Sequence, residues 1–143
     1  MPIGVVLWTT GHVARFAGRA VLDDPELDLV GCYAHSPAKV GRDIGELIGT
    51  APTGVMATDD VEALLALAPD VVAYYPILRV DQIPQHTELL CRFLRAGINV
   101  VTTSNVVTGR WWKAGKPSTK PDEPAVPPST GVASTRASST PWP

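Results

Sequence analysis

The sequence predicts an α/β fold in which about five parallel strands form a doubly wound sheet with helices on its faces. Two observations lead to this prediction. Short apolar runs rich in β-branched residues recur along the first hundred residues, a pattern typical of strands in parallel sheets. Between these runs lie segments whose apolar residues are spaced three or four apart, as on one face of a helix. Strands that alternate with helices favour a parallel sheet with right-handed crossovers.

The apolar runs mark the expected strands, of which the third is short. They are residues 3–8 (IGVVLW), 27–34 (LDLVGCYA), 54–57 (GVMA), 70–75 (DVVAYY) and 98–103 (INVVTT). The first run fits a strand that is covered on both faces.

The first helix is expected between the first two strands. Its apolar face is Val13, Phe16, Ala17, Ala20 and Val21, and Pro25 ends it. A polar stretch over residues 38–49 also has helical potential, with Val40, Ile44, Leu47 and Ile48 on one face.

Two further helices are predicted from their start signals. Asp59 and Glu62 have the spacing of a capping box ahead of an apolar run. Pro84 opens the last helix, and Gly97 stands where a glycine commonly follows a helix C-terminus. The apolar face of this last helix is Leu89, Leu90, Phe93 and Leu94.

The composition changes abruptly near residue 112. From Lys113 onward proline, serine and threonine dominate, and seven of the chain's 14 prolines lie in this segment. Such a segment cannot bury enough apolar surface to offset the entropy lost on ordering. We therefore expect a folded domain over residues 1–112 and a disordered tail over residues 113–143.

Composition also excludes several classes of function. The net charge of −2 gives no basic excess for nucleic acid. No apolar run approaches the roughly 18 residues of a membrane span, and no charged leader precedes one, so a cytoplasmic protein is expected. Cys32 and Cys91 match no metal-ligand spacing and are interpreted as reduced core thiols, so no metal site is predicted.

The turn after the first strand carries the strongest functional signal. It reads Thr9-Thr10-Gly11-His12-Val13-Ala14. In the dinucleotide fingerprint G-x-G-x-x-G/A, Gly11 takes the second position and Ala14 the third, whereas Thr9 replaces the first glycine. A helix N-terminus at this turn would present amides to a phosphate. The turn predicts a Rossmann-like sheet that binds a dinucleotide, although Gly11 is also compatible with an ordinary turn glycine.

The residues after the second strand bear on which dinucleotide is bound. NAD enzymes usually place Asp or Glu there to bind the ribose hydroxyls, but this strand is followed by His35, Ser36 and Lys39, with Arg42 beyond them. A hydroxyl and cations suit a 2′-phosphate, so NADP is expected in preference to NAD. A solvated polar loop is the alternative interpretation.

Polar residues also follow the fourth and fifth strands. Tyr75 and Pro76 come after one, and Thr102 and Thr103 close the other. In a parallel sheet they would share an edge with Gly11 and could flank the nicotinamide ribose and ring. From the spacing alone, ordinary turn chemistry at the strand ends is the preferred explanation. No nucleophile elbow or nucleophile–base pair is present, so no residue is assigned as catalytic. His86 is expected on the surface of the last helix.

Longer motifs resemble a known family over about residues 3–112. The segments WTTGHVARFAG, VGRDIGELIG, PTGVMATDDVEALLAL and LLCRFLRAGINVVTTSN resemble the N-terminal part of bacterial oxidoreductases related to dihydrodipicolinate reductase and 2,4-diaminopentanoate dehydrogenase, actinobacterial members above all. The resemblance implies an NAD(P)-dependent reaction on an amine or imine. It places Thr9–Ala14 at the pyrophosphate, His35, Ser36 and Lys39 at the adenosine ribose, and Tyr74–Pro76 and Thr102–Ser104 on the nicotinamide side.

In that family the fifth strand leads into a second α+β domain with the substrate site and the proton donor. Here the Pro/Ser/Thr-rich segment follows instead. The chain is therefore interpreted as a truncated or frameshifted product, inactive by itself unless a partner, or a second copy in a homo-oligomer, supplies the missing part. Two alternatives remain open: a non-catalytic nucleotide-binding module, and a truncated product with no function.

Overall fold

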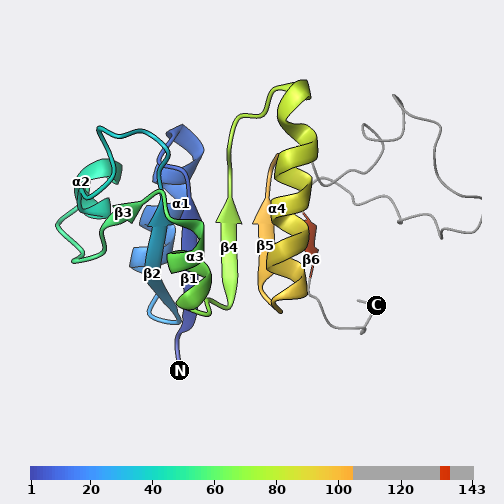
Figure 1. The fold of residues 1–143 in the computed structure, drawn as a ribbon. Helices are drawn as coiled ribbons and strands as arrows, with labels where there is room; N and C mark the ends of the chain where they lie inside the picture. Colours follow the sequence, from blue (N-terminus) through green and yellow to red (C-terminus); the bar gives the residue numbers. More distant parts are fainter. Residues whose placement is uncertain (105–132, 136–143) are drawn as a thin grey trace, which may run out of the picture.

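The computed structural model describes residues 1–104 and the backbone of residues 133–135. Its sheet has the strand order β3-β2-β1-β4-β5-β6, with β1 and β4 at the centre (Figure 1). The strands are β1 (Ile3–Trp8), β2 (Leu27–Tyr33), β3 (Ala57–Thr58), β4 (Val71–Tyr74), β5 (Asn99–Thr102) and β6 (Ala133–Thr135). The helices are α1 (His12–Asp23), α2 (Ile44–Ile48), α3 (Val61–Ala66) and α4 (Ile83–Arg95), the last preceded by a 3₁₀ turn, η1 (Val80–Gln82).

Strands β1 to β5 are parallel, which confirms the predicted Rossmann-like sheet. The predicted bounds are close for four strands, but the third begins at Ala57 instead of Gly54. The helical potential of residues 38–49 is realised only over Ile44–Ile48. Both differences lie in the segment around α2. There the chain is held by hydrogen bonds to the carboxylate of Asp43 instead of by a regular strand ladder.

The sixth strand was not predicted from the sequence. Ala133–Thr135 pair antiparallel with β5, in a register that joins Val101 to Ser134. They lie within residues 113–143, for which the sequence predicts a disordered tail. The rest of that segment, and the expected domain boundary near residue 112, lie outside the described residues.

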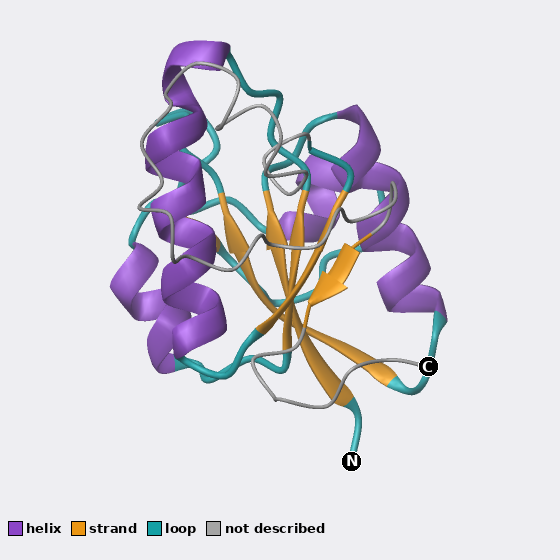
Figure 2. Cartoon of the chain, turned by 90° about the vertical axis from the view of Figure 1, so that its right-hand side faces the viewer, coloured by secondary structure: helices purple, strands orange, loops and turns teal. Residues whose placement is uncertain are grey.

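The core has two layers, one on each face of the sheet, as Figure 2 shows with helices on both sides of the strands. In β1, Val5 and Leu7 pack in one layer, with α1 and α2. Val6 and Trp8 pack in the other layer, with α3 and α4. Every side chain from Val5 to Trp8 is at most 3% exposed, so the continuous apolar run is explained by burial on both faces.

The buried face of α1 differs from the one predicted. Val13 and Phe16 are 49% and 61% exposed, whereas the buried residues are Ala14, Gly18 and Val21. Small residues face the sheet because α1 lies very close to it: a methyl group at Gly18 would lie 3.2 Å from Leu7 Cδ2. The helical spacing of the prediction is confirmed, but the buried face of α1 is shifted by about one residue, toward its small side chains.

The caps of the later helices are partly as predicted. Pro84 lies in the first turn of α4, as expected. The N-cap of α3 is Asp60, not Asp59: its carboxylate accepts from the Ala63 amide at 3.0 Å. No helix in the described part of the chain is long and apolar enough to cross a membrane.

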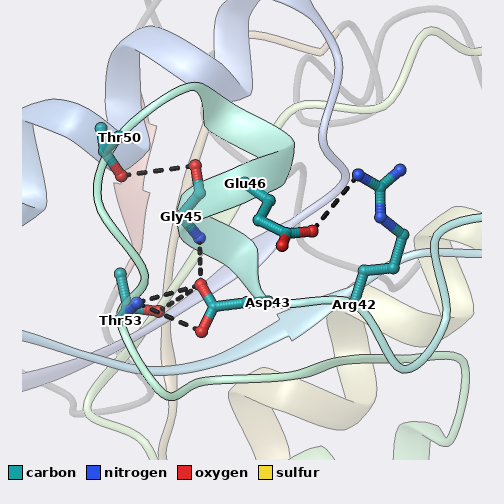
Figure 3. Close-up of polar contacts among 6 residues, drawn as sticks. All are labelled: Arg42, Asp43, Gly45, Glu46, Thr50 and Thr53. Atoms are coloured by element: carbon teal, nitrogen blue, oxygen red, sulfur yellow. Dashed lines mark hydrogen bonds and ion pairs between the residues drawn. The ribbon is translucent and has the colours of Figure 1, made fainter.

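Asp43 holds together the segment between β2 and β3 (Figure 3). Its carboxylate caps α2 by accepting from the Gly45 amide at 2.7 Å. It also accepts from the amides of Thr53 and Gly54, at 3.0 and 2.7 Å, and from the Thr53 hydroxyl. The two ends of the segment are thereby tied to each other, so one side chain takes the place of a longer helix and strand.

Gly45 is required beside this carboxylate. A Cβ at this position would lie 2.0 Å from the Ala51 carbonyl oxygen, which is backbone and cannot yield cheaply. The motif residues of VGRDIGELIG are therefore explained by a tight loop around Asp43.

We predict that Asp43 makes stability depend on acid pH. Hydrogen bonds from the Thr53 amide first, and then from the Gly54 and Gly45 amides, lower the pKa of Asp43 despite partial desolvation. A lowered pKa in the folded state means that this contribution is present above the unfolded value of about 4 and is lost as the pH falls through the folded value. Asp43→Asn should melt about 5 °C lower at pH 7 and lose less stability than wild type between pH 7 and pH 3.

The measurement is thermal unfolding followed by circular dichroism across this pH range. Asp28→Asn, on the exposed side of β2, is the matched control. An Asp43→Asn protein with the same acid profile as wild type would contradict the assignment.

Candidate functional site

The carboxyl ends of four parallel strands are level with one another. Trp8 pairs with Tyr33 on one side and with Tyr74 on the other, and Tyr74 pairs with Thr102. The Trp8 ring stacks on Tyr33, with ring centroids 4.2 Å apart. The residues that follow these strand ends therefore share one edge of the sheet, where open parallel sheets bind their ligands.

The first turn bends at Thr9. Its φ is +90°, a left-handed conformation that a β-branched residue rarely adopts and that the fingerprint assigns to glycine. The Thr9 amide donates to the Tyr33 carbonyl at 3.0 Å, which holds the strained residue in place. The Thr9 hydroxyl oxygen is buried, and it has no hydrogen-bond partner among the residues that the structure describes.

Gly11 is the N-cap of α1 and has an ordinary backbone conformation, with φ −72° and ψ −173°. A Cβ added there would meet no described atom within 4 Å. Neither conformation nor packing within the described structure therefore requires glycine at this position. The first turn of α1 has no acidic residue and no side-chain cap, so neither supplies an acceptor to the amide groups of that turn.

The other residues of the turn separate into a buried and an exposed set. Ala14 is fully buried against β1, which fits the small third position of the fingerprint. His12 and Val13 are exposed. The His12 ring meets Phe16 edge-on at 5.1 Å, on the outer side of α1.

Lys39 is brought back to the first turn. Its ammonium group donates to the Thr10 hydroxyl at 2.9 Å, and Thr10 itself is only 5% exposed. The chain returns because the Ser36 carbonyl accepts from the amides of Lys39 and Val40, at 2.9 and 3.2 Å. His35 is exposed beside this turn. Sequence reasoning grouped Lys39 with Ser36, and the structure adds that its charge lies at the glycine turn.

Arg42, the other cation of this segment, points elsewhere. It pairs with Glu46 on α2 at 3.3 Å, where both side chains are about half exposed (Figure 3). Lys39 and Arg42 are therefore distinct in position, and only Lys39 contacts the turn after β1.

The ends of β4 and β5 form the other part of the edge. Tyr75 is half-buried, and burial raises the pKa of its hydroxyl. The Pro76 carbonyl accepts from the Ser104 hydroxyl at 2.8 Å. Thr102 is buried and Thr103 is exposed. The structure thus brings the predicted residues of both strand ends to the edge that also carries Gly11.

Two expectations are corrected nearby. Tyr74, which the resemblance placed on the nicotinamide side, is fully buried in the core. Its hydroxyl is hydrogen-bonded to Nδ1 of His86, so His86 is half-buried and not on the surface. Burial lowers the pKa of His86. An i, i+3 pattern on α4 cannot show which polar residue faces a buried tyrosine of another strand.

The two cysteines are free thiols. Cys32 is buried, and desolvation raises the pKa of its thiol to about 12 although Lys39 acts in the opposite direction. Cys32 is therefore an unreactive core residue, as predicted. Cys91 is half-buried on α4.

An open cleft among the described residues lies away from this edge. It has a volume of about 470 Å³ and lies between the end of α1 and the loop after α2, lined by residues that include Arg19, Leu22 and Thr53. The glycine turn lies on an open edge instead. None of the residues of the glycine turn lines this cleft.

The curated relatives of this chain are dehydrogenases and reductases. Over 74 residues, half of the chain, it is 53% identical to an amine dehydrogenase of Streptomyces virginiae, of which the match covers 20%. Over 64 residues, 45% of the chain, it is 41% identical to a 4-hydroxy-tetrahydrodipicolinate reductase of Synechocystis sp., of which the match covers 23%. The N-terminal half of the chain is similar to both kinds of enzyme. This confirms the resemblance to dihydrodipicolinate reductases.

Solved structures agree with this resemblance. An amine dehydrogenase from Mycobacterium smegmatis superposes with a TM-score of 0.68 and 28% identity, over 81% of this chain and 34% of that one. Two more distant structures show the fold alone. GenD2 from gentamicin A biosynthesis in complex with NAD has a TM-score of 0.58 and 18% identity, over 75% of this chain and 28% of that one. A Synechocystis biliverdin reductase in complex with biliverdin and NADP⁺ has a TM-score of 0.57 and 21% identity, over 80% of this chain and 33% of that one. No protein-family model matches the chain. The chain spans about a fifth to a quarter of the length of the curated relatives it matches.

We predict that Thr9→Gly stabilises the protein. A non-glycine residue in the left-handed region costs roughly 1–3 kcal/mol, whereas glycine loses about 0.5–1 kcal/mol more backbone entropy on folding than alanine does. The replacement also removes a buried hydroxyl without a partner among the described residues. The free energy of unfolding in urea should rise by about 1 kcal/mol.

Thr10→Gly is the matched control, because Thr10 lies outside the positive-φ region and its hydroxyl oxygen accepts a hydrogen bond from Lys39. It should lower stability. A Thr9→Gly protein that is less stable than wild type would show that the turn is not strained.

Proposed function

We propose that residues 1–104 form the NAD(P)-binding part of an oxidoreductase that acts on an amine or an imine. The observation that carries the proposal is Gly11, a glycine that the described structure itself does not require. It stands at the second position of a dinucleotide fingerprint, where a side chain would prevent close approach of a pyrophosphate. The similarity to amine dehydrogenases and 4-hydroxy-tetrahydrodipicolinate reductases supports the substrate class.

The residues at the edge fit a dinucleotide. The amides of the first turn of α1, with the positive end of its dipole, would hold the pyrophosphate beside Gly11. Ala14 lets the helix lie close to the sheet, so these amides are near the strand end. Thr9, Thr10, His12 and Val13 form the rest of the turn. Tyr75, Pro76 and Thr103 line the part of the edge expected to hold the nicotinamide half, and Thr102 is buried at the same strand end.

NADP is the cofactor proposed in preference to NAD. No acid follows β2, where an NAD enzyme usually binds the ribose diol. The Lys39 ammonium lies against the turn, with Ser36 and His35 on the same loop, so a 2′-phosphate would meet a cation and a hydroxyl there.

Hydride transfer to or from a substrate carbon is the chemistry that bound NADP would supply. This chain's residues would bind and orient the cofactor and keep its pyrophosphate fixed. The reaction also needs the substrate held at about 3–3.5 Å with a proton donor in place, which in a two-domain dehydrogenase the second domain provides. We therefore propose that the 143 residues alone bind the cofactor without turnover, and that further chain, a second copy or another subunit completes the site. A cytoplasmic location stays a prediction.

We predict that Gly11→Val abolishes cofactor binding without unfolding the protein. A Cβ at this position would meet no described atom within 4 Å, and the backbone there is ordinary, so the circular dichroism spectrum should stay that of wild type. The same side chain would occupy the path of the pyrophosphate, and the affinity for NADP should fall roughly 100-fold. Isothermal titration calorimetry measures this. Ala20→Val, exposed on α1, is the control; normal NADP binding by Gly11→Val would place the cofactor elsewhere.

We predict that NADP binds at least about tenfold more tightly than NAD, because a charge-assisted bond to the 2′-phosphate is made by NADP alone. Lys39→Gln should remove most of this preference and leave NAD affinity within about threefold. Arg42→Gln, whose cation pairs with Glu46, should leave the preference intact. Equal losses for both cofactors in Lys39→Gln would assign Lys39 to the shared pyrophosphate. NAD binding as tight as NADP in wild type would refute the preference outright.

A further inference from the structure

Ser104 links the ends of β4 and β5 where their ladder stops. The last paired residues are Tyr74 and Thr102. Two residues further along each strand, the Ser104 hydroxyl donates to the Pro76 carbonyl at 2.8 Å. The Ser104 amide in turn donates to the Thr102 hydroxyl at 2.9 Å. The register of the sheet therefore continues by one more step, through side chains.

Proline explains why a side chain is needed at this step. The Tyr75 amide points to β1, since it donates to the Trp8 carbonyl at 3.4 Å. Amides alternate sides along a strand, so the next amide, that of residue 76, would face β5. Pro76 has no N–H, and the backbone ladder cannot continue there. The Pro76 carbonyl still faces β5, and the Ser104 hydroxyl satisfies it.

Among the described residues, the Ser104–Pro76 hydrogen bond is the last one that joins the sheet to the chain after β4. Directly after it, Ile77 is 98% exposed, so the chain leaves the sheet at once on its way to η1. Pro76 and Ser104 are themselves half-buried. The position of the Tyr75–Pro76 backbone at the edge thus depends on Ser104, on the part of the edge opposite the second-strand loop.

We infer that Ser104 is a positioning residue for the nicotinamide half of the cofactor, which it serves by fixing the Tyr75–Pro76 backbone. The inference rests on the proposed function. Its consequence is selective, because the adenosine half of the cofactor would be held by the turn at Gly11 and by Lys39, which Ser104 does not contact. A purely structural role would weaken both halves alike.

The experiment compares two ligands on the full chain by isothermal titration calorimetry: NADP, and 2′,5′-ADP, which lacks the nicotinamide half. Ser104→Ala should weaken NADP about five- to tenfold, the effect of one neutral hydrogen bond, and leave 2′,5′-ADP within about twofold. Ser104→Thr, which keeps the hydroxyl, should restore most of the NADP affinity. Thr50→Ala removes a hydroxyl that donates to a backbone carbonyl of α2, outside the sheet, and should change the affinity for neither ligand.

Thr102→Val offers a second route to the same result, because it removes the acceptor of the Ser104 amide without altering Ser104. It should also weaken NADP selectively. Unchanged NADP affinity in Ser104→Ala, or equal losses for NADP and 2′,5′-ADP, would overturn the inference while leaving the proposed function in place. Failure of the wild-type chain to bind 2′,5′-ADP would overturn the proposed function, and this inference with it.

Discussion

Burial of β1 on both faces is the constraint on which the rest of the structure depends. Its side chains alternate between two helical layers, and each fully buried one contributes roughly 1.5–3 kcal/mol of transfer free energy. A strand in this position needs neighbours in register on both sides. At the carboxyl end these neighbours are Tyr33 of β2 and Tyr74 of β4, which both pair with Trp8. The Trp8 ring stacks on Tyr33, and Phe93 of α4 meets it edge-on at 5.0 Å. This aromatic group therefore lies where the level carboxyl ends of β1, β2 and β4 meet α4.

The level ends determine the geometry of the turn. Once β1 stops at Trp8, α1 must start within three residues and pack closely enough for Ala14 and Gly18 to touch the sheet. The chain meets this requirement by placing Thr9 in a conformation suited to glycine. The strain is local, since the Thr9 amide donates to the neighbouring strand. Gly11 is the N-cap of α1, but nothing in the described structure requires a glycine at that position. The two threonines and one glycine of this turn therefore have different roles that their order alone does not reveal.

The segment between β2 and β3 gains its order from hydrogen bonds as well as from α2, whose Ile44 and Ile48 are buried in the core. Asp43 joins α2 to the loop over residues 53–54, and the chain before it turns back at Ser36. That return carries Lys39 to Thr10, 29 residues earlier in the chain. The position of Lys39 at the glycine turn is thus set by the segment between β2 and β3, which the carboxylate of Asp43 helps to hold together. The equivalent restraint at the other end of the edge is the Ser104 hydroxyl on Pro76.

The sequence by itself determined the fold class and the order of the elements, because the apolar runs and helical spacings of the first hundred residues report burial, and burial in a parallel sheet leaves few topologies. It also identified the glycine turn and the loop with Lys39, since both are contiguous motifs. Only the tertiary structure decided which face of α1 is buried, that Tyr74 bonds to His86 inside the core, and that Ala133–Thr135 pair with β5. The tertiary structure also showed that Lys39 contacts Thr10 whereas Arg42 pairs with Glu46. These are contacts between residues distant in sequence, or choices between neighbouring side chains set by the space available, and no local periodicity encodes either.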